Sequence, residues 1–471
     1  MEGDEANFPP DSSDNLSQRG SVASSATLSR AQDVLIYLFG ESAVHLTVEG
    51  LGSVTVQELG RSVRETLNIP DSIQDVFAFW LCSPLLELQL KPRHQPYKLC
   101  RQWHDLLYRF TEASEEDISQ DEPFLQYRRN VFYSKSKELL IEDEAVLRLL
   151  FEEAKSNILT GRYPCDPEHW TSLGALSLAI EEGSGLESQK LTATIKEKKL
   201  SSFLPAHVAL GSGGLLSTLR GKSSRQACLE QSLLEEYRKI STSAGNSSEC
   251  AQLLHHYLNT CHSLPYYGCG FFYGDIDKPV QGILQRGRRK AVTVGICLEG
   301  VYVMDVKEKH VLLGLRFSEL CWDHTYPEEE GDSHILWLEF DGEEDGTPVN
   351  KLLKIYSKQA ELMSGFIEFC VELKCVSEAT AAADTDGETS QAQASGKDSS
   401  NKNGRGGRRG LLRRQSSVVC SRVHSLNTIS YVDNGKEIKR LKPKRAASFF
   451  SRQATISTYS AVQGADNLEQ G

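Results

Sequence analysis

The spacing of apolar residues changes twice along the 471-residue chain, and this change constrains the fold more than any other feature. Residues 34–48 alternate as in a β-hairpin, with a turn at Gly40-Glu41-Ser42. Helical spacing follows from about residue 115 to 261, and a period of two returns after Pro265. A chain that switches in this way predicts an α+β protein built of three successive lobes.

The first lobe is expected at residues 32–113. After the hairpin, Thr55 and Glu58 have the spacing of a capping box, and an amphipathic helix follows as far as Pro70. Further strands are predicted at VFAFWL, LLELQL and 97–103. This order of elements is typical of a ubiquitin-like β-grasp.

The second lobe is expected at residues 114–264 and is helical. Its clearest helix is DEAVLRLLFEEAKSNIL, which places Val146, Leu150 and Ala154 on one face and ends at Gly161. Two more amphipathic stretches, CLEQSLLEEYRKI and AQLLHHYLNTC, complete the expected bundle.

The third lobe is expected at residues 265–376. Strands are predicted at GILQRG, at KAVTVGICLEGVYVMDV with a turn at Glu299-Gly300, and at HVLLGLRFSELCWDH, ILWLEF and LLKIYS. A helix at 358–373 closes the lobe. Antiparallel strands followed by one helix are the plan of a PH/PTB-like β-sandwich.

The two ends, residues 1–31 and 377–471, are polar and are expected to be disordered. The net charge of the chain is −12, but residues 401–471 contain fourteen Lys and Arg against four Asp and Glu. An acidic body therefore carries a basic tail, and the tail is the part expected to meet anionic surfaces. No feature indicates nucleic-acid binding.

No arrangement of residues predicts an enzyme. The twelve cysteines include no CxxC pair and no zinc-ligand spacing, and the phosphate-binding, nucleophile-elbow, zincin and kinase motifs are absent. Cys261-His262 has the reverse order of a phosphatase loop. We expect no catalytic residue, metal or cofactor.

The compartment is expected to be the cytosol. The N-terminal sequence has no apolar core of signal-peptide length, and no run of about 18 apolar residues predicts a membrane span. Scattered cysteines within apolar runs fit a reducing environment.

The junction between the second and third lobes resembles the FERM signature. A helix ending in Tyr257-Leu258 is followed by Leu264-Pro265-Tyr266-Tyr267-Gly268 and by Phe271-Phe272, with slightly altered spacing. The resemblance implies the three-lobed FERM cloverleaf: a ubiquitin-like lobe, a helical bundle like acyl-CoA-binding protein, and a PH/PTB-like lobe. It also implies an adaptor, peripheral at the cytosolic face of the plasma membrane.

Longer stretches are similar to one group within this family. They are SPLLELQLKPRHQPYKL, DEPFLQYRRNVFY, SYVDNGKEIK and RLKPKRAASFFSRQ. This resemblance implies binding to the N-terminal cytosolic tail of iRhoms, with protection of the iRhom–sheddase complex from lysosomal degradation. It further implies modulation of Wnt signalling through a co-receptor tail. A membrane–cytoskeleton linker, a phosphoinositide-binding scaffold and a regulatory lobe for an enzyme in trans stay open as alternatives.

A PH/PTB-like lobe offers a groove between an edge strand and its C-terminal helix, where an extended peptide adds as a strand. The expected edge is HVLLGLRF or its neighbour. Leu362, Phe366 and Phe369 are expected mainly to pack onto the sheet, so peptide contacts fall to flanking positions.

Two basic segments, 286–290 and Lys91 with Arg93 and His94, suggest contacts with phosphoinositide headgroups. Arg286, Arg288, Arg289 and Lys290 are candidates for anionic lipid headgroups, although a short basic loop is commonly only solvated surface.

The basic tail and the N-terminus also contain candidate phosphorylation sites. In the tail an Arg stands three residues before each of Ser416, Ser417, Ser448 and Thr455, and Ser21 is a candidate in the N-terminus. Phosphate there would reverse the local charge or create a motif for a 14-3-3-type reader. The alternative is a solubilising tail with incidental serines.

Overall fold

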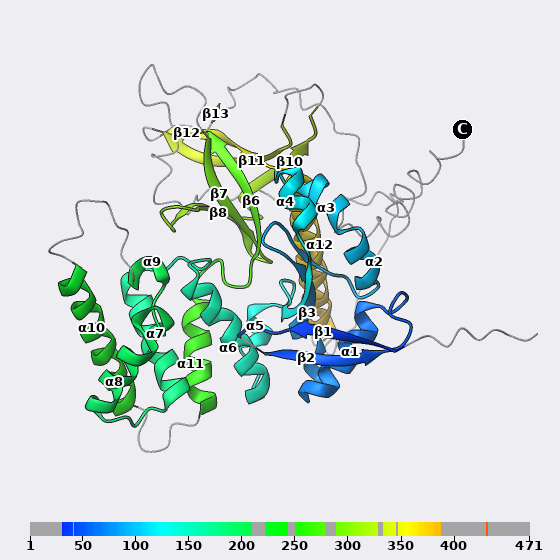
Figure 1. The fold of residues 1–471 in the computed structure, drawn as a ribbon. Helices are drawn as coiled ribbons and strands as arrows, with labels where there is room; N and C mark the ends of the chain where they lie inside the picture. The colour runs from blue at the N-terminus through cyan, green and yellow to red at the C-terminus, as the bar shows by residue number, and fades with distance from the viewer. Residues whose placement is uncertain are drawn as a thin grey trace, which may run out of the picture.

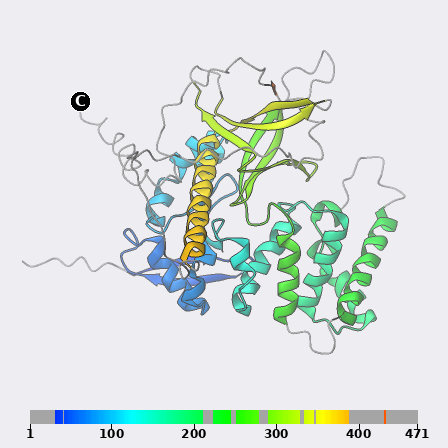
Figure 2. The same ribbon diagram turned by 180° about the vertical axis from the view of Figure 1, so that it is seen from behind.

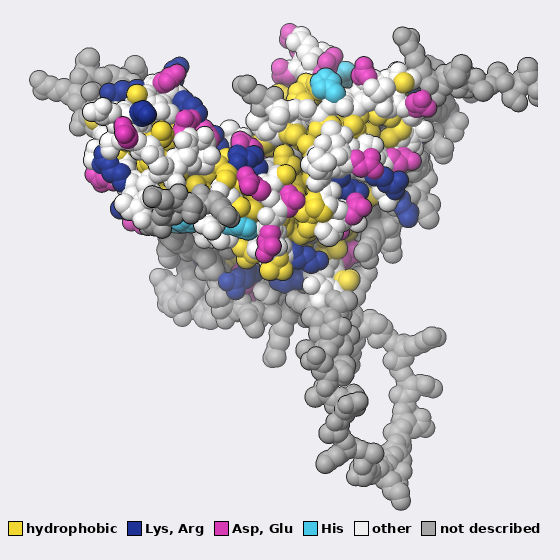
Figure 3. Space-filling model, turned by 90° about the horizontal axis from the view of Figure 1, so that it is seen from below, with side chains coloured by type: hydrophobic (Ala, Val, Ile, Leu, Met, Phe, Trp, Pro, Cys, Tyr) yellow, Lys and Arg dark blue, Asp and Glu magenta, His cyan; other side chains and the backbone are white. Residues whose placement is uncertain are grey.

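Two separate sheets and a helical bundle organise the chain. The computed structural model describes residues 31–40, 42–209, 222–243, 250–277, 289–327, 333–344, 347–387 and 430–431. Within these ranges the elements gather into three lobes around a common centre (Figure 1). Seen from below, hydrophobic side chains gather toward the middle of the surface (Figure 3).

The first lobe contains a five-stranded sheet in the order β2-β1-β5-β3-β4. β1 pairs with β2 in antiparallel fashion and with β5 in parallel fashion, as a β-grasp requires. The strands are β1 (Gln32–Tyr37), β2 (Ala43–Val48), β3 (Phe77–Cys82), β4 (Glu87–Gln89) and β5 (Phe124–Arg129).

One helix, α1 (Val56–Leu67), packs under this sheet, and its start confirms the predicted capping box. The Thr55 side chain accepts a hydrogen bond from the Glu58 backbone N–H, while the Glu58 carboxylate accepts from the Thr55 N–H at 2.8 Å. Leu59 and Val63 are only 2% and 0% exposed. The short 3-10 helix η1 (Asp71–Val76) follows.

The strand predicted at 97–103 is wrong. This region forms α2 (Pro96–Arg101) and the start of α3 (Trp103–Phe110). Proline at the first helical position favours α2, because its ring fixes a helical φ and its missing N–H needs no partner there. Trp103, Leu107 and Phe110 are buried at helical spacing. The four-residue spacing, rather than alternation, determines the outcome.

The first sheet extends past the boundary that the sequence suggests at residue 113. The short helix α4 (Glu115–Gln120) leads into β5, which lies between β1 and β3. A parallel partner for β1 requires a long crossover connection, so this strand comes late in the chain. Phe124–Arg129 therefore belongs to the first lobe, not to the helical one.

The second lobe is helical, as predicted. α7 lies between α10 and α11, and α11 also packs against α6. Val146, Leu150 and Ala154 are buried on α6, and Gly161 follows that helix with φ of 72°. The elements are α5 (Lys135–Glu138), α6 (Glu144–Leu159), α7 (Pro167–Glu182), α8 (Ser188–Lys198), η2 (Leu200–Ser202), α9 (Ala206–Ala209), α10 (Lys222–Ser243) and α11 (Cys250–His262).

The third lobe is an antiparallel sheet in the order β10-β11-β12-β6-β7-β8-β9. The predicted turn at 299–300 is confirmed: a Cβ on Gly300 would lie 2.0 Å from the Leu315 carbonyl oxygen, so only glycine fits. The strand predicted at 282–287 lies outside the described residues. The strands are β6 (Gly270–Asp277), β7 (Arg289–Ile296), β8 (Gly300–Asp305), β9 (Val311–Arg316), β10 (Leu320–Thr325), β11 (Ile335–Glu344) and β12 (Thr347–Tyr356), and β13 (Ser430–Tyr431) pairs with β12.

The closing helix, α12 (Ala360–Gly387), begins on this sheet and extends further than the predicted 358–373. Leu362 and Phe366 are 0% and 1% exposed, and the Phe366 ring packs on Phe272 of β6, as expected. Phe369 differs from the expectation: it is half-buried and packs on Phe132, in the segment between the first and second lobes. From behind, α12 is seen to run from the third lobe down to the first (Figure 2). The helix thus joins two lobes that are far apart in sequence.

Candidate functional site

A cleft of about 1120 Å³ opens where the lobes meet. Its walls come from α1, from β3, from residues 129–137 between the first and second lobes, from the turn at 297–299 and from residues 369–377 in the middle of α12. These segments lie far apart in the chain, so the cleft exists only when the lobes are assembled.

One wall of the cleft is apolar. Phe132 and Phe369 are half-buried and meet edge to face, with ring centroids 4.6 Å apart. Phe77 and Val131, both buried, also line the cleft, as does Leu373 on α12. Half-buried aromatic side chains of this kind can cover an apolar ligand group.

The rim of the cleft is basic, in contrast to the acidic chain as a whole. Seven lining residues are Lys or Arg and three are Asp or Glu. A cleft with one predominant sign of charge concentrates ligands of the opposite sign. Six of the cations are half-buried or exposed on the rim (Arg61, Arg64, Lys91, Lys135, Lys137 and Lys374), the seventh, Arg129, is buried beneath it, and the anions are Asp71, Asp75 and Glu299.

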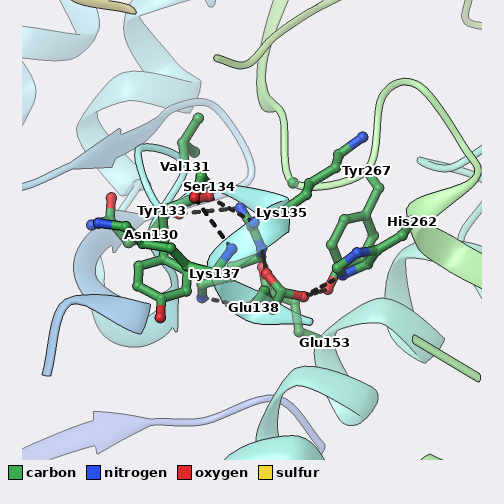
Figure 4. Close-up of polar contacts among 12 residues, drawn as sticks. Asn130, Val131, Tyr133, Ser134, Lys135, Lys137, Glu138, Glu153, His262 and Tyr267 are labelled. Atoms are coloured by element: carbon green, nitrogen blue, oxygen red, sulfur yellow. Dashed lines mark hydrogen bonds and ion pairs between the residues drawn. The ribbon is translucent and has the colours of Figure 1, made fainter. Parts of the chain in front are cut away.

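Below the rim, a buried ion pair joins β5 to α5. Arg129 Nε donates to Glu138 Oε2 at 2.6 Å, and Arg129 Nη2 donates to the Tyr133 carbonyl at 2.9 Å. The second Glu138 oxygen accepts from the Tyr267 hydroxyl and lies 2.8 Å from His262 Nε2 (Figure 4). This network ties the first lobe to the helix and signature segment at 262–268.

The network explains a glycine of the signature. Gly268 has φ of +73°, and a Cβ there would lie 2.4 Å from Arg129 Nη1. Its N–H donates to the Tyr163 hydroxyl at 3.0 Å. Any larger residue at position 268 would clash with Arg129, so glycine allows the signature segment to lie this close to the arginine.

Electrostatics keeps Glu138 ionised. Burial by itself would raise the pKa of this carboxyl, but the Arg129 guanidinium and the hydrogen bonds from His262 and Tyr267 outweigh burial and lower the pKa to about 2. The ion pair is therefore fully charged near neutral pH.

A second buried network joins the first two lobes. Glu87 accepts two hydrogen bonds from Arg162, at 2.7 and 2.9 Å, and one from Arg128 at 3.0 Å. Burial opposes ionisation of Glu87, yet the two arginines lower its pKa to about 2. Glu153 accepts from the Arg129 backbone N–H at 2.6 Å, and burial raises the pKa of this carboxyl.

A third charged contact joins the first and third lobes. Arg109 on α3 donates two hydrogen bonds to Glu361 on α12, at 3.0 and 2.8 Å. Glu361 is 3% exposed. Because each lobe is tied to another by a charged contact, the cleft has a defined shape before any ligand enters.

The structure places part of the predicted lipid-contact segment. Lys290 pairs with Asp305, and Arg289 lies over the Tyr356 ring at 3.8 Å. Arg286 and Arg288 lie outside the described residues. The five candidate phosphorylation sites, Ser21, Ser416, Ser417, Ser448 and Thr455, also lie outside them.

The edge strand beside the closing helix is β10, which follows in the chain after HVLLGLRF, the segment that forms β9. α12 packs against β10 and β11, whereas β9 stands at the opposite end of the strand order. Cys321 on β10 is exposed and Trp322 is half-buried. The expected peptide groove is therefore bounded by β10 and α12.

The three-lobe cleft itself was not predicted. Arg61, Lys137 and Phe369 carry no common motif, and only the fold brings them together. The one local signal was the signature segment, which supplies Tyr267 and Gly268 to the same region.

Within the described ranges, no group of three or more His, Cys, Asp or Glu is placed to hold a metal ion. None of the helices in that part of the chain is long and apolar enough to cross a bilayer.

Two family models match parts of the chain. The sequence model of the FERM central domain matches residues 136–272, and that of the KRIT1/FRMD8 FERM domain C-lobe matches residues 290–366. Among solved structures, the human myosin 7b C-terminal MyTH4-FERM domain, solved with the harmonin-a PDZ3 domain, aligns with a TM-score of 0.48 and 12% identity, covering 73% of this chain and 60% of that one. The FERM and C-terminal domain complex of Drosophila Merlin gives a TM-score of 0.45 and 14% identity over 75% and 98%.

Curated relatives match over the whole length. FERM domain-containing protein 8 of Danio rerio is 71% identical over 100% of both chains, and the proteins of the same name in Mus musculus and Homo sapiens are each 53% identical over 100% of both. FERM domain proteins are in general non-enzymatic adaptors. This chain belongs to the family of FERM domain-containing protein 8, an adaptor-type family built on the FERM fold.

Proposed function

We propose that this chain is a non-enzymatic cytosolic adaptor, peripheral at the plasma membrane, whose cleft binds the cytoplasmic tails of membrane proteins. The observation that carries the proposal is the basic rim and apolar wall of the three-lobe cleft. The foremost partner is the N-terminal tail of iRhoms, as the resemblance within the family implies.

The shape and charge of the cleft support a peptide ligand. A volume of about 1120 Å³ slightly exceeds that of small-molecule pockets, which span roughly 300–1,000 Å³. Phe132 and Phe369 can cover an apolar side chain, while Arg61 and Lys137 on the exposed rim attract carboxylates. An acidic tail segment with one or two large apolar residues satisfies both. The basic C-terminal tail of this chain does not, because its charge repels the rim.

Binding of this kind would stabilise the partner complex by mass action. A ligand that binds only the assembled form shifts the balance away from the dissociated form. Occupation of the iRhom tail would thereby keep the iRhom–sheddase complex at the cell surface and away from lysosomal degradation. The tail of a Wnt co-receptor would compete for the same cleft.

The direct test is a binding titration. Fluorescence anisotropy would follow a labelled peptide of the iRhom N-terminal tail as the full chain is added, with the double variant Arg61→Glu/Lys137→Glu as the cleft variant. Lys190→Glu, exposed on α8, is the matched charge control. We expect tight binding to wild type and control, and at least tenfold weaker binding to the double variant. Equal affinity of all three proteins for the peptide would exclude the cleft as its binding site.

A phosphoinositide-binding scaffold is the second candidate, because the basic rim and Arg286, Arg288, Arg289 and Lys290 would also suit phosphate groups. Flotation with vesicles containing phosphatidylinositol bisphosphate distinguishes the two. Lipid binding without peptide binding would favour the scaffold, and co-sedimentation with actin filaments would favour a cytoskeletal linker.

A further inference from the structure

Two buried cysteines face each other across the start of the third-lobe sheet. β6 and β7 are antiparallel, with Gly270 opposite Ile296. The next residues outward are Cys269 and Cys297, 5% and 4% exposed. Both are free thiols in this structure.

Facing residues on antiparallel strands form either hydrogen-bonded or non-hydrogen-bonded pairs, and Cys269 and Cys297 are of the second, closer kind. The Cys269 N–H donates to the Tyr266 carbonyl and the Cys297 N–H donates to the Gly300 carbonyl, so the cysteines exchange no backbone hydrogen bonds with each other. Side chains of such non-hydrogen-bonded pairs approach more closely, with Cβ atoms about 4.5 Å apart. A disulfide needs a Cβ separation of about 3.5–4.5 Å, so only a small adjustment is required.

The two thiols differ in character. Burial raises the pKa of Cys269 well above its ordinary value, whereas the hydrogen bond from Cys269 lowers the pKa of Cys297. The thiolate is the reactive form, and Cys297 is the favoured nucleophile of the pair. Cys297 also lines the cleft, and this is the side from which a small oxidant would approach it.

We propose that Cys269 and Cys297 are a redox-active pair that forms a reversible disulfide when a hydroperoxide enters the cleft. The Cys297 thiolate attacks one peroxide oxygen, the O–O bond breaks, and Cys297 becomes a sulfenic acid. The departing oxygen takes the proton that the thiol has lost and leaves as water from hydrogen peroxide, or as an alcohol from an alkyl hydroperoxide. The Cys269 thiolate then attacks that sulfur, and the S–S bond forms as the sulfenic oxygen leaves as water. Two electrons pass from the two thiols to the peroxide.

The bond would sit beside the assembled centre of the molecule. Gly268, next to Cys269, contacts Arg129, and Glu299, two residues after Cys297, pairs with Lys135 at 3.1 Å. Oxidation would therefore join the two segments, 267–269 and 297–299, that contribute residues to one side of the cleft. The proposal does not depend on which ligand the cleft binds.

The test is mass spectrometry of the full chain after treatment with hydrogen peroxide, denaturing alkylation of free thiols and non-reducing digestion. We expect a cross-linked peptide pair containing Cys269 and Cys297, which dithiothreitol converts back to two alkylatable thiols. Cys297→Ser abolishes this pair, and Cys321→Ser, an exposed cysteine on β10, leaves it unchanged.

The wild-type measurement decides the question even if a variant fails to fold. Recovery of both cysteines as free thiols, at peroxide doses that oxidise the exposed Cys100 and Cys375, would overturn the proposal. So would a predominant disulfide between Cys297 and the buried Cys370, since that bond would show that the cross-strand geometry does not determine the pairing.

Discussion

Arg129 and Glu138 form an ion pair of 2.6 Å between side chains that are 4% and 1% exposed. Arg129 ends the last strand of the first sheet, and Glu138 lies on the short helix that opens the second lobe. Because Tyr267 and His262 contact the same carboxylate, one buried pair joins the first lobe to the passage between the second and third.

Breaking this pair should destabilise the whole assembly. Arg129→Met leaves the Glu138 carboxylate buried without its main partner, and loss of one member of a buried pair costs about 3–5 kcal/mol. We expect a marked fall in the thermal unfolding midpoint, measured by circular dichroism. Arg148→Met, an exposed i,i+4 pair with Glu144, is the control and should shift the midpoint little. Equal shifts would contradict the role given to Arg129.

The same pair predicts a pH dependence. The pKa of Glu138 is about 2 in the folded chain against an ordinary value of 4.5. A lowered carboxyl pKa stabilises the folded state above the ordinary value, and this contribution is lost as pH falls from about 4.5 toward 2. In Glu138→Gln, the loss of stability across this window should be smaller than in wild type. Parallel acid-unfolding curves for the two proteins would contradict the prediction.

The apolar wall should contribute to tail binding independently of the rim charges. Phe369→Ala removes a half-buried aromatic ring from the cleft, and we expect about 5–30-fold weaker peptide binding, equivalent to about 1–2 kcal/mol. Phe124→Ala, an exposed aromatic of β5 outside the cleft lining, is the matched control. Calorimetric titration of both variants with the peptide provides the comparison. Equal losses of affinity in the two variants would show that the apolar wall does not contribute to binding.

The capping box of α1 should make a measurable but modest contribution to the free energy of unfolding. Thr55→Ala removes the acceptor for the Glu58 N–H, and loss of such a cap costs about 1 kcal/mol. Thr55→Ser keeps the hydroxyl and should restore most of the stability. Denaturation midpoints of the three proteins test this, and an alanine variant as stable as wild type would refute it.

The tail prediction can be tested without structural information. Phosphorylation at Ser416, Ser417, Ser448 or Thr455 places about −1.5 to −2 charges in a basic segment. Phosphopeptide mapping of the chain from cells should recover these sites, and 14-3-3 capture should depend on them. Alanine at all four positions with undiminished capture would contradict this reading of the tail.

Local chemistry predicted local structure well. Thr55 and Glu58 lie three residues apart and needed no tertiary information to identify a helix start. Residues 97–103 were harder, because Pro96 and the spacing of Trp103 and Leu107 support a helix while the aromatic composition supports a strand. There the helical spacing of the buried residues Trp103, Leu107 and Phe110 outweighs the aromatic composition.

Contacts between segments far apart in the chain could not be predicted from the sequence. β5 joins the first sheet some 90 residues after β1, and no pattern in FLQYRR specifies that parallel pairing. Arg61, Lys137 and Lys374 form one rim only after three lobes assemble. The signature supplied Tyr267 and Gly268 by resemblance, but their contacts with Glu138 and Arg129 emerge only from the folded chain.

Hydrogen–deuterium exchange of the full chain, with and without the iRhom N-terminal tail peptide, tests the central claim most directly. Binding in the cleft should slow exchange in residues 129–137, in the turn at 297–299 and in the part of α12 that lines the cleft. Protection confined to β10 and the adjoining face of α12, or no protection at saturating peptide, would contradict a tail-binding cleft at the centre of the three lobes.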